Sequence, residues 1–397
     1  MPQTVRADVD RLTPPAPADT ALDEMVPHLR SLGLGLVASQ PGDRDVVVSP
    51  VSIAVAFAMV EAGAGDETAA DILHAFRFPE PPAVHEAMNA LTTALAAVSR
   101  PGRDGDGAGA ITLEVANAVW AQVGLELGAP FLATLAAHYG AGVTTVDYAA
   151  DPDAARQEIN AWVAEVTRDR IPQLLPPGAV TGDTVVALVN AVYLDAAWRT
   201  PFERSRTRDR PFTLLDGREV DVPTMHNPAL TTVASAADDG TSVVKLPYAG
   251  GELAMVVLVP PRDVGLATFE AELTETRLGA MVDRLGRARV DLTLPRWATR
   301  SALDLAEPLA ALGLRIPGGD LSGMAPGAFI GAAVHAADIT VDEERTVAAA
   351  ATAVMAGRAA MDEPPRLQIA VDRPFLFIVQ HEPTRAPLFV GRVTDPR

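Results

Sequence analysis

The spacing of apolar positions is helical near the N-terminus and strand-like over much of the rest of the chain. Helices are expected at 21–39, 53–62, 67–76, 151–170, 266–285 and 303–312. The one at 53–62 is apolar nearly all round, which predicts burial, and Asp66 is expected to cap the next. The block 46–52 reads as a short strand entering a helix, and further strands are expected at 111–120, 185–194, 243–247, 253–259 and 290–294. The run 185–194 is too apolar for an edge strand, so we expect it in the middle of a sheet. Helices first and strands later predict an α+β domain.

Residues 333–393 hold a less ordinary pattern. A strand is expected at 333–342 and a buried hairpin at 373–380 and 386–393. Between them lies an alanine tract with no charge from Thr346 to Gly357, which ends at the breaker 362–365. Alanine is the best helix former, so the tract is compatible with a surface helix. Read with period 2, one face is small and uncharged and is suited to entering between two strands; it carries Thr346, Ala348, Ala350, Thr352, Val354 and Ala356. The pattern alone leaves both interpretations open.

Composition narrows the classes of function. The chain has 397 residues, 48% of them hydrophobic, which is enough for a sizeable core. A net charge of −19 argues against nucleic acid or an anionic membrane as a partner. No apolar run reaches 18 residues, so no membrane span is expected. Cysteine is absent, which fits a reducing compartment, and residues 1–10 lack the apolar core of a signal peptide, so we expect cytoplasmic residence. Residues 1–19 are expected to be a flexible lead-in. Lys245 is the only lysine and alanine is abundant, which indicates GC-rich codon usage and a bacterial source of the actinobacterial type.

Motifs of catalysis are not found. The sequence has no Gly-x-Ser-x-Gly elbow, no His-Glu-x-x-His and no Walker loop, and its seven histidines lack metal-ligand spacing. Ser49 and His335 could form a triad with one of many aspartates, but nothing in the pattern favours it. We therefore expect no enzyme activity, no metal and no cofactor.

The blocks Glu343–Thr352, Arg373–Phe377 and Pro387–Gly391 closely resemble the serpin family. Further matches in the same order are Val48–Ile53, Val189-Asn190 before Trp198, Pro201–Glu203 and Leu246–Tyr248. The resemblance covers residues 20–397. It implies a single serpin domain with three β-sheets, about nine helices and an exposed reactive-centre loop at about 343–365.

The resemblance also implies a mechanism and a set of sites. Members of the family act as suicide substrates of serine proteases: the cut loop inserts into the main sheet and traps the covalently bound protease. The shutter, a polar cluster under the centre of that sheet, would comprise Ser49, Ser52, Asn190 and His335. The breach, at the top of the sheet, would hold Trp198 and Glu343. The hinge would comprise Glu343, Glu344, Arg345, Thr346, Val347, Ala348, Ala349, Ala350, Ala351 and Thr352.

The family register places the reactive bond at Ala359-Ala360, which suits an elastase-like or subtilisin-like protease. A register one residue shorter places it at Arg358-Ala359 and suits a trypsin-like one. Arg345 stands where inhibitory members usually have glycine, and Val347 where glutamate is common. A missing glycine can slow the movement of the hinge, which gives the protease time to complete hydrolysis. We therefore expect an inhibitor of which an appreciable fraction is cleaved as a plain substrate. We also expect a monomer. The alternative is a non-inhibitory serpin-fold protein that is cleaved as a plain substrate. Family members are often extracellular, which leaves export open.

Overall fold

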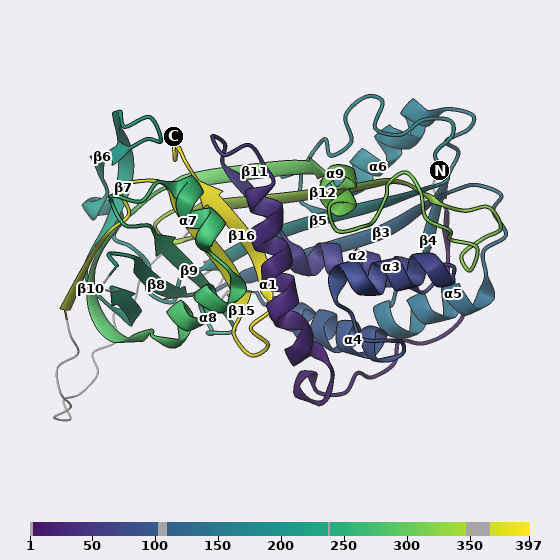
Figure 1. Cartoon of the computed structure of the whole chain (residues 1–397), viewed down its shortest axis with the longest axis horizontal. Helices are drawn as coiled ribbons and strands as arrows, with labels where there is room; N and C mark the ends of the chain where they lie inside the picture. Colours follow the sequence, from purple (N-terminus) through teal and green to yellow (C-terminus); the bar gives the residue numbers. More distant parts are fainter. Residues whose placement is uncertain (1–2, 102–108, 237–238, 347–365) are drawn as a thin grey trace.

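The main sheet has the strand order β1-β4-β3-β5-β12-β11 in the computed structural model, which describes residues 3–101, 109–236, 239–346 and 366–397 (Figure 1). Its strands are β1 (Gln3–Val5), β4 (Val143–Val146), β3 (Ile111–Gln122), β5 (Val186–Ala197), β12 (Ile330–Val341) and β11 (Trp297–Asp304), and β13 (Arg345–Thr346) also pairs with β5. β5 lies antiparallel to β3 and parallel to β12. The expectation that the run 185–194 is a central strand is therefore confirmed.

The second sheet has the order β14-β10-β7-β8-β9-β15-β16-β2, with β6 also paired to β7. Its strands are β2 (Val46–Val48), β6 (Arg208–Thr213), β7 (Glu219–Ala236), β8 (Ser242–Pro247), β9 (Leu253–Val259), β10 (Gly286–Pro295), β14 (Arg366–Ala370), β15 (Phe375–His381) and β16 (Pro387–Val393). The hairpin of β15 and β16 is buried, as the pattern predicts. β7 is 18 residues long and pairs with β6 and β10 before it reaches β8. Two of the three expected sheets are thus continuous with each other through β7.

The described residues contain nine α-helices, so the α+β class is confirmed. They are α1 (Leu22–Ala38), α2 (Pro50–Glu61), α3 (Asp66–Phe76), α4 (Ala83–Ala96), α5 (Ala129–Thr134), α6 (Pro152–Val166), α7 (Leu266–Glu272), α8 (Glu275–Asp283) and α9 (Ala306–Ala310). Two short 3₁₀ helices, η1 (Pro17–Asp19) and η3 (Arg204–Arg206), and one π-helix, η2 (Leu135–Tyr139), accompany them. Every residue of α2 is buried, as its all-round apolar sequence predicts. The helix begins where the Ser49 hydroxyl accepts the N–H of Ser52 and Pro50 occupies the first turn. No described helix has the length and apolar character needed to cross a membrane.

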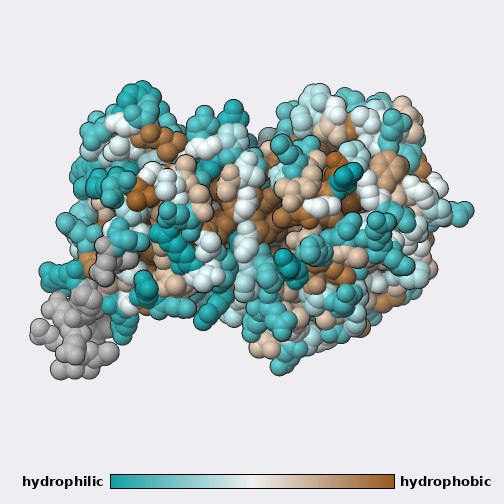
Figure 2. Space-filling model, viewed as in Figure 1, coloured by the Kyte–Doolittle hydropathy of each residue, from teal (hydrophilic) through white to brown (hydrophobic). Residues whose placement is uncertain are grey.

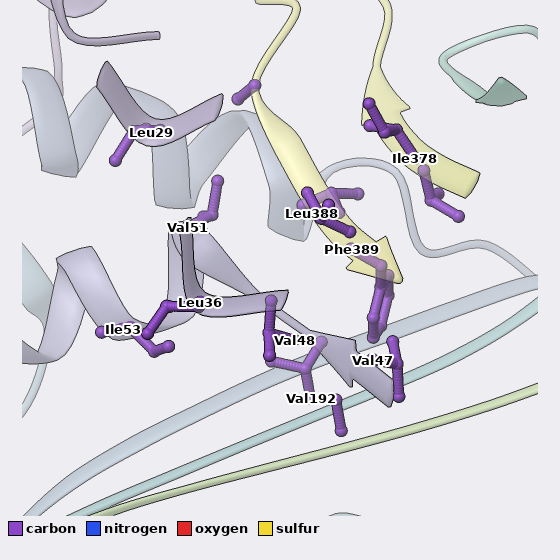
Figure 3. Packing of buried hydrophobic residues seen from close by; sticks show 14 of the residues in the cluster. Leu29, Leu36, Val47, Val48, Val51, Ile53, Val192, Ile378, Leu388 and Phe389 are labelled. Carbon is purple, nitrogen blue, oxygen red and sulfur yellow. The ribbon is translucent and has the colours of Figure 1, made fainter. Parts of the chain in front are cut away.

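Apolar side chains pack on both faces of the main sheet. On one face α2 packs on β5, and residues of α1, β2 and β16 belong to the same apolar cluster, as Figure 3 shows for Leu36, Ile53, Val48, Phe389 and Val192. On the other face α6 packs on β3, and its apolar residues share a second cluster with residues of β5 and β12. Figure 2 shows hydrophilic residues over much of the visible surface and hydrophobic ones gathered near its middle. Both faces of the main sheet are therefore covered.

Three local expectations differ from the structure. Gly65, rather than Asp66, is the N-cap residue of α3. The predicted helix at 266–285 is two helices, because the Thr274 hydroxyl caps a new one by accepting the N–H of Arg277. Residues 303 and 304 end β11 instead of starting a helix, because Leu303 and Asp304 pair with His335 and Val334.

The N-terminal segment is attached to the body by contacts that its composition does not predict. Gln3–Val5 forms β1, which pairs with β4 and supplies hydrogen bonds to the edge of the main sheet. Arg11 donates to the side chains of Asn89 and Thr92 on α4. These contacts join the segment from Gln3 onward to the body, and the flexible lead-in expected for residues 1–19 stays a prediction.

Candidate functional site

Three polar residues form one row across the middle of the main sheet. Asn117 on β3 lies opposite Asn190 on β5, and Asn190 lies opposite His335 on β12. The alternation of each strand points all three side chains to the face on which α2 packs. Ser49 is the N-cap residue of α2 and Ser52 lies in its first turn. Both serines lie against this row because α2 begins there. The four residues of the expected shutter are thus brought together.

Hydrogen bonds join the row to α2. The amide of Asn190 donates to the Ser52 hydroxyl and to the side-chain oxygen of Asn117. Ser52 in turn donates its hydroxyl proton to Asn117 at 3.0 Å. Nδ1 of His335 bonds the side-chain oxygen of Asn190. Asn117 is therefore a fifth member of this polar cluster, although no motif marked it.

His335 is neutral in this network. Its Nε2 accepts the backbone N–H of Ser49 at 2.9 Å, so the ring proton is assigned to Nδ1, which donates to Asn190. Complete burial lowers the pKa of His335 to about 3. A second ring proton would remove the acceptor of the Ser49 N–H. The network therefore requires the uncharged ring.

The same bonds bear on the triad considered for Ser49 and His335. The histidine bonds the backbone of Ser49, whereas the Ser49 hydroxyl accepts the N–H of Ser52. The nitrogen that a general base would use is therefore not aimed at the serine oxygen. This arrangement gives the hydrolase alternative no support.

Trp198 and Glu343 lie together at the end of β5 where β12 gives way to the hinge. The indole Nε1 of Trp198 donates to the carbonyl of Asp342 at 2.9 Å, and its ring stacks on Tyr248 with a centroid separation of 4.5 Å. The backbone N–H of Trp198 donates to the carbonyl of Glu344, and that of Phe202 to the carbonyl of Glu343. The segment after β5 thus holds the start of the hinge through its main chain.

Glu343 carries a buried carboxylate that is hydrogen-bonded through its Oε1 atom. Its side chain is 1% exposed and accepts from Nε of Arg296 at 2.8 Å and from the Thr207 hydroxyl. Burial by itself would raise the pKa of this carboxyl, but the bonds from Thr207 and Arg296 outweigh it and hold the pKa below its usual value. Glu344 pairs with Arg204 at 3.0 Å. Ion pairs therefore fix both acidic residues of the hinge.

β5 and β12 are paired at the shutter and unpaired at the breach. Their parallel ladder runs from Val186 opposite Ile330 to Tyr193 opposite Asp338 and stops there. Beyond it, β13 lies antiparallel to β5, with Thr346 opposite Ala196 and Arg345 opposite Ala197. The first two residues after Glu344 thus already occupy a strand position beside β5. Sequence reasoning missed Arg296 and Thr207 because neither belongs to a motif and both reach Glu343 only through the fold.

The hinge residues Val347 to Thr352 and the candidate reactive bonds at Arg358, Ala359 and Ala360 lie outside the described residues. Within the described part of the chain, no group of three or more histidine, cysteine or acidic residues has an arrangement that could hold a metal ion.

Comparisons with known proteins agree on one family. Residues 34–396 match the family model "Serpin (serine protease inhibitor)". The chain is 34% identical over 363 residues to the leukocyte elastase inhibitor of Bos taurus, covering 89% of this chain and 93% of that protein. It is also 34% identical to putative serpin-Z12 of Oryza sativa subsp. japonica, covering 99% and 95%. Among solved structures, the thermophilic serpin tengpin in the native state superposes with a TM-score of 0.82 at 21% identity, covering 98% and 97%.

Proposed function

This chain belongs to the serpin family, and we propose that it inhibits a serine-type endopeptidase as a suicide substrate. The protease serine attacks a bond in the reactive-centre loop and forms an acyl-enzyme. The cut segment then enters the main sheet between β5 and β12; serpins are themselves a standard case of such strand insertion. The attached protease is dragged along, and distortion of its oxyanion hole blocks deacylation.

The observation that carries this proposal is the position of β13. It lies antiparallel to β5 beyond the point where β5 and β12 stop pairing. A strand that continues from β13 between them is antiparallel to both neighbours, because β5 and β12 are parallel to each other. One parallel ladder is then exchanged for two antiparallel ladders, which are the more stable kind per residue. The exchange supplies a driving force for insertion.

The register of β13 also fits the alanine tract. Thr346 lies opposite Ala196, and the two strands run in opposite directions. If the loop continues in this register, Thr352 comes opposite Asn190, because the one lies six residues after this pair and the other six residues before it. Thr346, Ala348, Ala350 and Thr352 then share the face of the shutter, where their small uncharged side chains bury no charge. Val347 comes opposite Asp195 on the other face. The strand interpretation of the tract is the one that this register favours.

The shutter is the barrier to this insertion. The bond between Asn190 and His335 joins the two strands that have to part. In the inserted state Thr352 lies beside Asn190, and its hydroxyl can take over the hydrogen bond that His335 gives up. We propose that the shutter holds the uncut sheet closed in this way.

Incubation with elastase, subtilisin and trypsin in turn tests the function. We expect an SDS-resistant covalent complex with elastase or subtilisin and, by mass spectrometry, cleavage at Ala359-Ala360. A complex with trypsin instead would place the bond at Arg358-Ala359. The nicked protein should melt well above the intact one, since it gains a central strand. If all three proteases nick the loop without a complex and the melting temperature does not rise, the inhibitor function is wrong.

The non-inhibitory alternative has one observation in its favour, which is Arg345 in the place of the usual hinge glycine. The position of that residue in β13 weakens the objection, because an extended strand does not need the left-handed backbone that favours glycine. Simple nicking in the experiment above would favour this alternative.

A further inference from the structure

A cavity of about 480 Å³ lies next to the breach, where the segment after β5 meets β7 and β8. Trp198 and Phe202 line it from that segment, and Leu230 and Leu246 line it from the two strands. All four side chains are at least 95% buried, so they form an apolar floor. Cavities of this volume take small organic molecules.

The rim of this cavity is cationic, although the whole protein carries a net charge of −19. Arg199, Lys245 and Arg287 line it, and Glu382 is its single acidic residue. Glu382 is occupied, since one carboxylate oxygen accepts from Lys245 at 2.9 Å and the other from Gln380 at 2.6 Å. Within the described residues, neither Arg199 nor Arg287 has an ion pair or a side-chain hydrogen bond. Two arginines are thus available to a ligand.

The position of Arg199 depends on Gly251. A β-carbon on Gly251 would lie 2.2 Å from Nη2 of Arg199. The backbone of Gly251 also has a φ angle of +90°, which residues with a side chain rarely adopt. The glycine therefore leaves the space that the guanidinium occupies beside the cavity. A substitution at Gly251 displaces Arg199 without removing its charge.

We propose that this cavity binds an amphipathic carboxylate, with its apolar tail on the floor of Trp198, Phe202 and Leu230 and its head group at the cationic rim. Arginine suits the head group because its planar fork bonds both carboxylate oxygens. The apolar floor excludes a small inorganic anion as the preferred occupant, since such an ion would leave that surface uncovered. The combination of floor and rim defines the ligand class.

Binding here is coupled to the hinge. The N–H groups of Trp198 and Phe202 hold the carbonyls of Glu344 and Glu343, and both side chains line the cavity. A ligand that packs on Trp198 and Phe202 stabilises this segment in the uninserted arrangement, so it should slow insertion of the loop. This second step rests on the proposed function, whereas the binding step does not.

Lys245 provides a direct readout because it is the only lysine in the chain. An amine-acylating reagent modifies this residue and the N-terminus, which mass spectrometry separates. With 0.1 mM decanoate as the probe, we expect acylation of Lys245 to slow at least threefold while the N-terminus reacts as before. The neutral analogue 1-decanol should leave both rates unchanged.

Variants complete the test. Arg199→Gln combined with Arg287→Gln should weaken decanoate binding at least tenfold by calorimetry, and Gly251→Ala should weaken it less. The exposed Arg284, which does not line the cavity, provides the matched control Arg284→Gln, with unchanged binding expected. Equal protection by 1-decanol, or unchanged binding in the double variant, would overturn the proposal. These measurements use no protease, so their failure is distinct from a failure of inhibition. The rate of complex formation with elastase, with and without decanoate, then tests the coupling, and an unchanged rate would overturn that step alone.

Discussion

Nδ1 of His335 on β12 bonds the side-chain oxygen of Asn190 on β5, and so joins the two strands between which the cut loop is proposed to enter. The bond lies at the middle of the ladder, completely buried, with α2 packed beneath it. The same ring accepts the backbone N–H of Ser49 through Nε2, so the charge state of His335 decides whether the start of α2 stays bonded to this pair.

Acid should weaken the native state through His335. Because its folded pKa of about 3 lies below the ordinary value of 6.5, the unfolded chain takes up a proton first as the pH falls. The contribution of the neutral ring is complete above about pH 6.5 and is lost between there and about pH 3, by at most about 1.4 kcal/mol per pH unit. Urea unfolding from pH 7.5 to 4.5 should show a shallower pH dependence in His335→Gln than in the wild type. The exposed His28 supplies the control His28→Gln, which should keep the wild-type slope; an equal slope in His335→Gln contradicts the prediction.

Asn117 should contribute to stability as a member of the shutter. Asn117→Ala removes the oxygen that accepts from both Ser52 and Asn190, and leaves buried donors without a partner. We expect the free energy of unfolding to fall by about 1–3 kcal/mol. Asn227→Ala, on β7 in the second sheet, is the control, and a similar loss there would remove the special role of Asn117. Denaturant unfolding measures both.

Arg296 should stabilise the hinge through Glu343. Arg296→Met leaves the buried carboxylate with Thr207 alone, so we expect a loss of about 1.5–3 kcal/mol at neutral pH. In the wild-type protein the pKa of Glu343 is held below its ordinary value. The ion pair therefore contributes to the free energy of unfolding above the ordinary pKa, and this contribution is lost as the pH falls through the lower folded pKa. The variant should therefore lose more stability at pH 7 than at pH 4. Arg208→Met, an exposed arginine on β6, is the control; equal losses at both pH values would count against the ion pair.

Thr352→Arg should convert the inhibitor into a substrate. In the register of β13 this side chain comes opposite Asn190, which is 2% exposed on the face where α2 packs, so an arginine there buries a charge during insertion. Val347→Arg adds the same charge on the opposite face, beside the half-buried Asp195, and should be tolerated. The number of inhibitor molecules consumed per protease inactivated should rise severalfold in the first variant and little in the second. Equal behaviour of the two variants would show that the register is wrong.

The wild-type protein should consume clearly more than one molecule per protease, because the ion pairs of Glu343 and Glu344 hold the start of the hinge. Arg345 fits the extended strand β13, but a residue with a side chain has fewer backbone conformations than glycine while the hinge moves. Arg345→Gly should lower this number towards one by freeing the backbone. Titration of a fixed amount of elastase measures the ratio. A wild-type value close to one would contradict the expectation.

The sequence by itself determined the elements whose apolar pattern is strong. The all-apolar α2, the central strand β5 and the hairpin of β15 and β16 are where the periodicity places them, since burying a continuous apolar run leaves few alternatives. Through motifs it also marked four residues that the structure brings together in one polar cluster, and Trp198 and Glu343, which lie close to each other. The predicted ends of elements were wrong where a neighbouring strand or a helix cap sets them, as at Leu303 and Thr274.

Only the tertiary structure decided which polar groups satisfy one another. Asn117 joins the polar cluster because the register of β3 against β5 sets it opposite Asn190. Arg296 contacts Glu343, although the two residues are 47 positions apart in the sequence. The attachment of β1 to β4 and the cationic cavity around Lys245 likewise bring together distant segments. A hydrogen bond or an ion pair depends on distances of about 3 Å across strands, and local sequence periodicity fixes faces but not those distances.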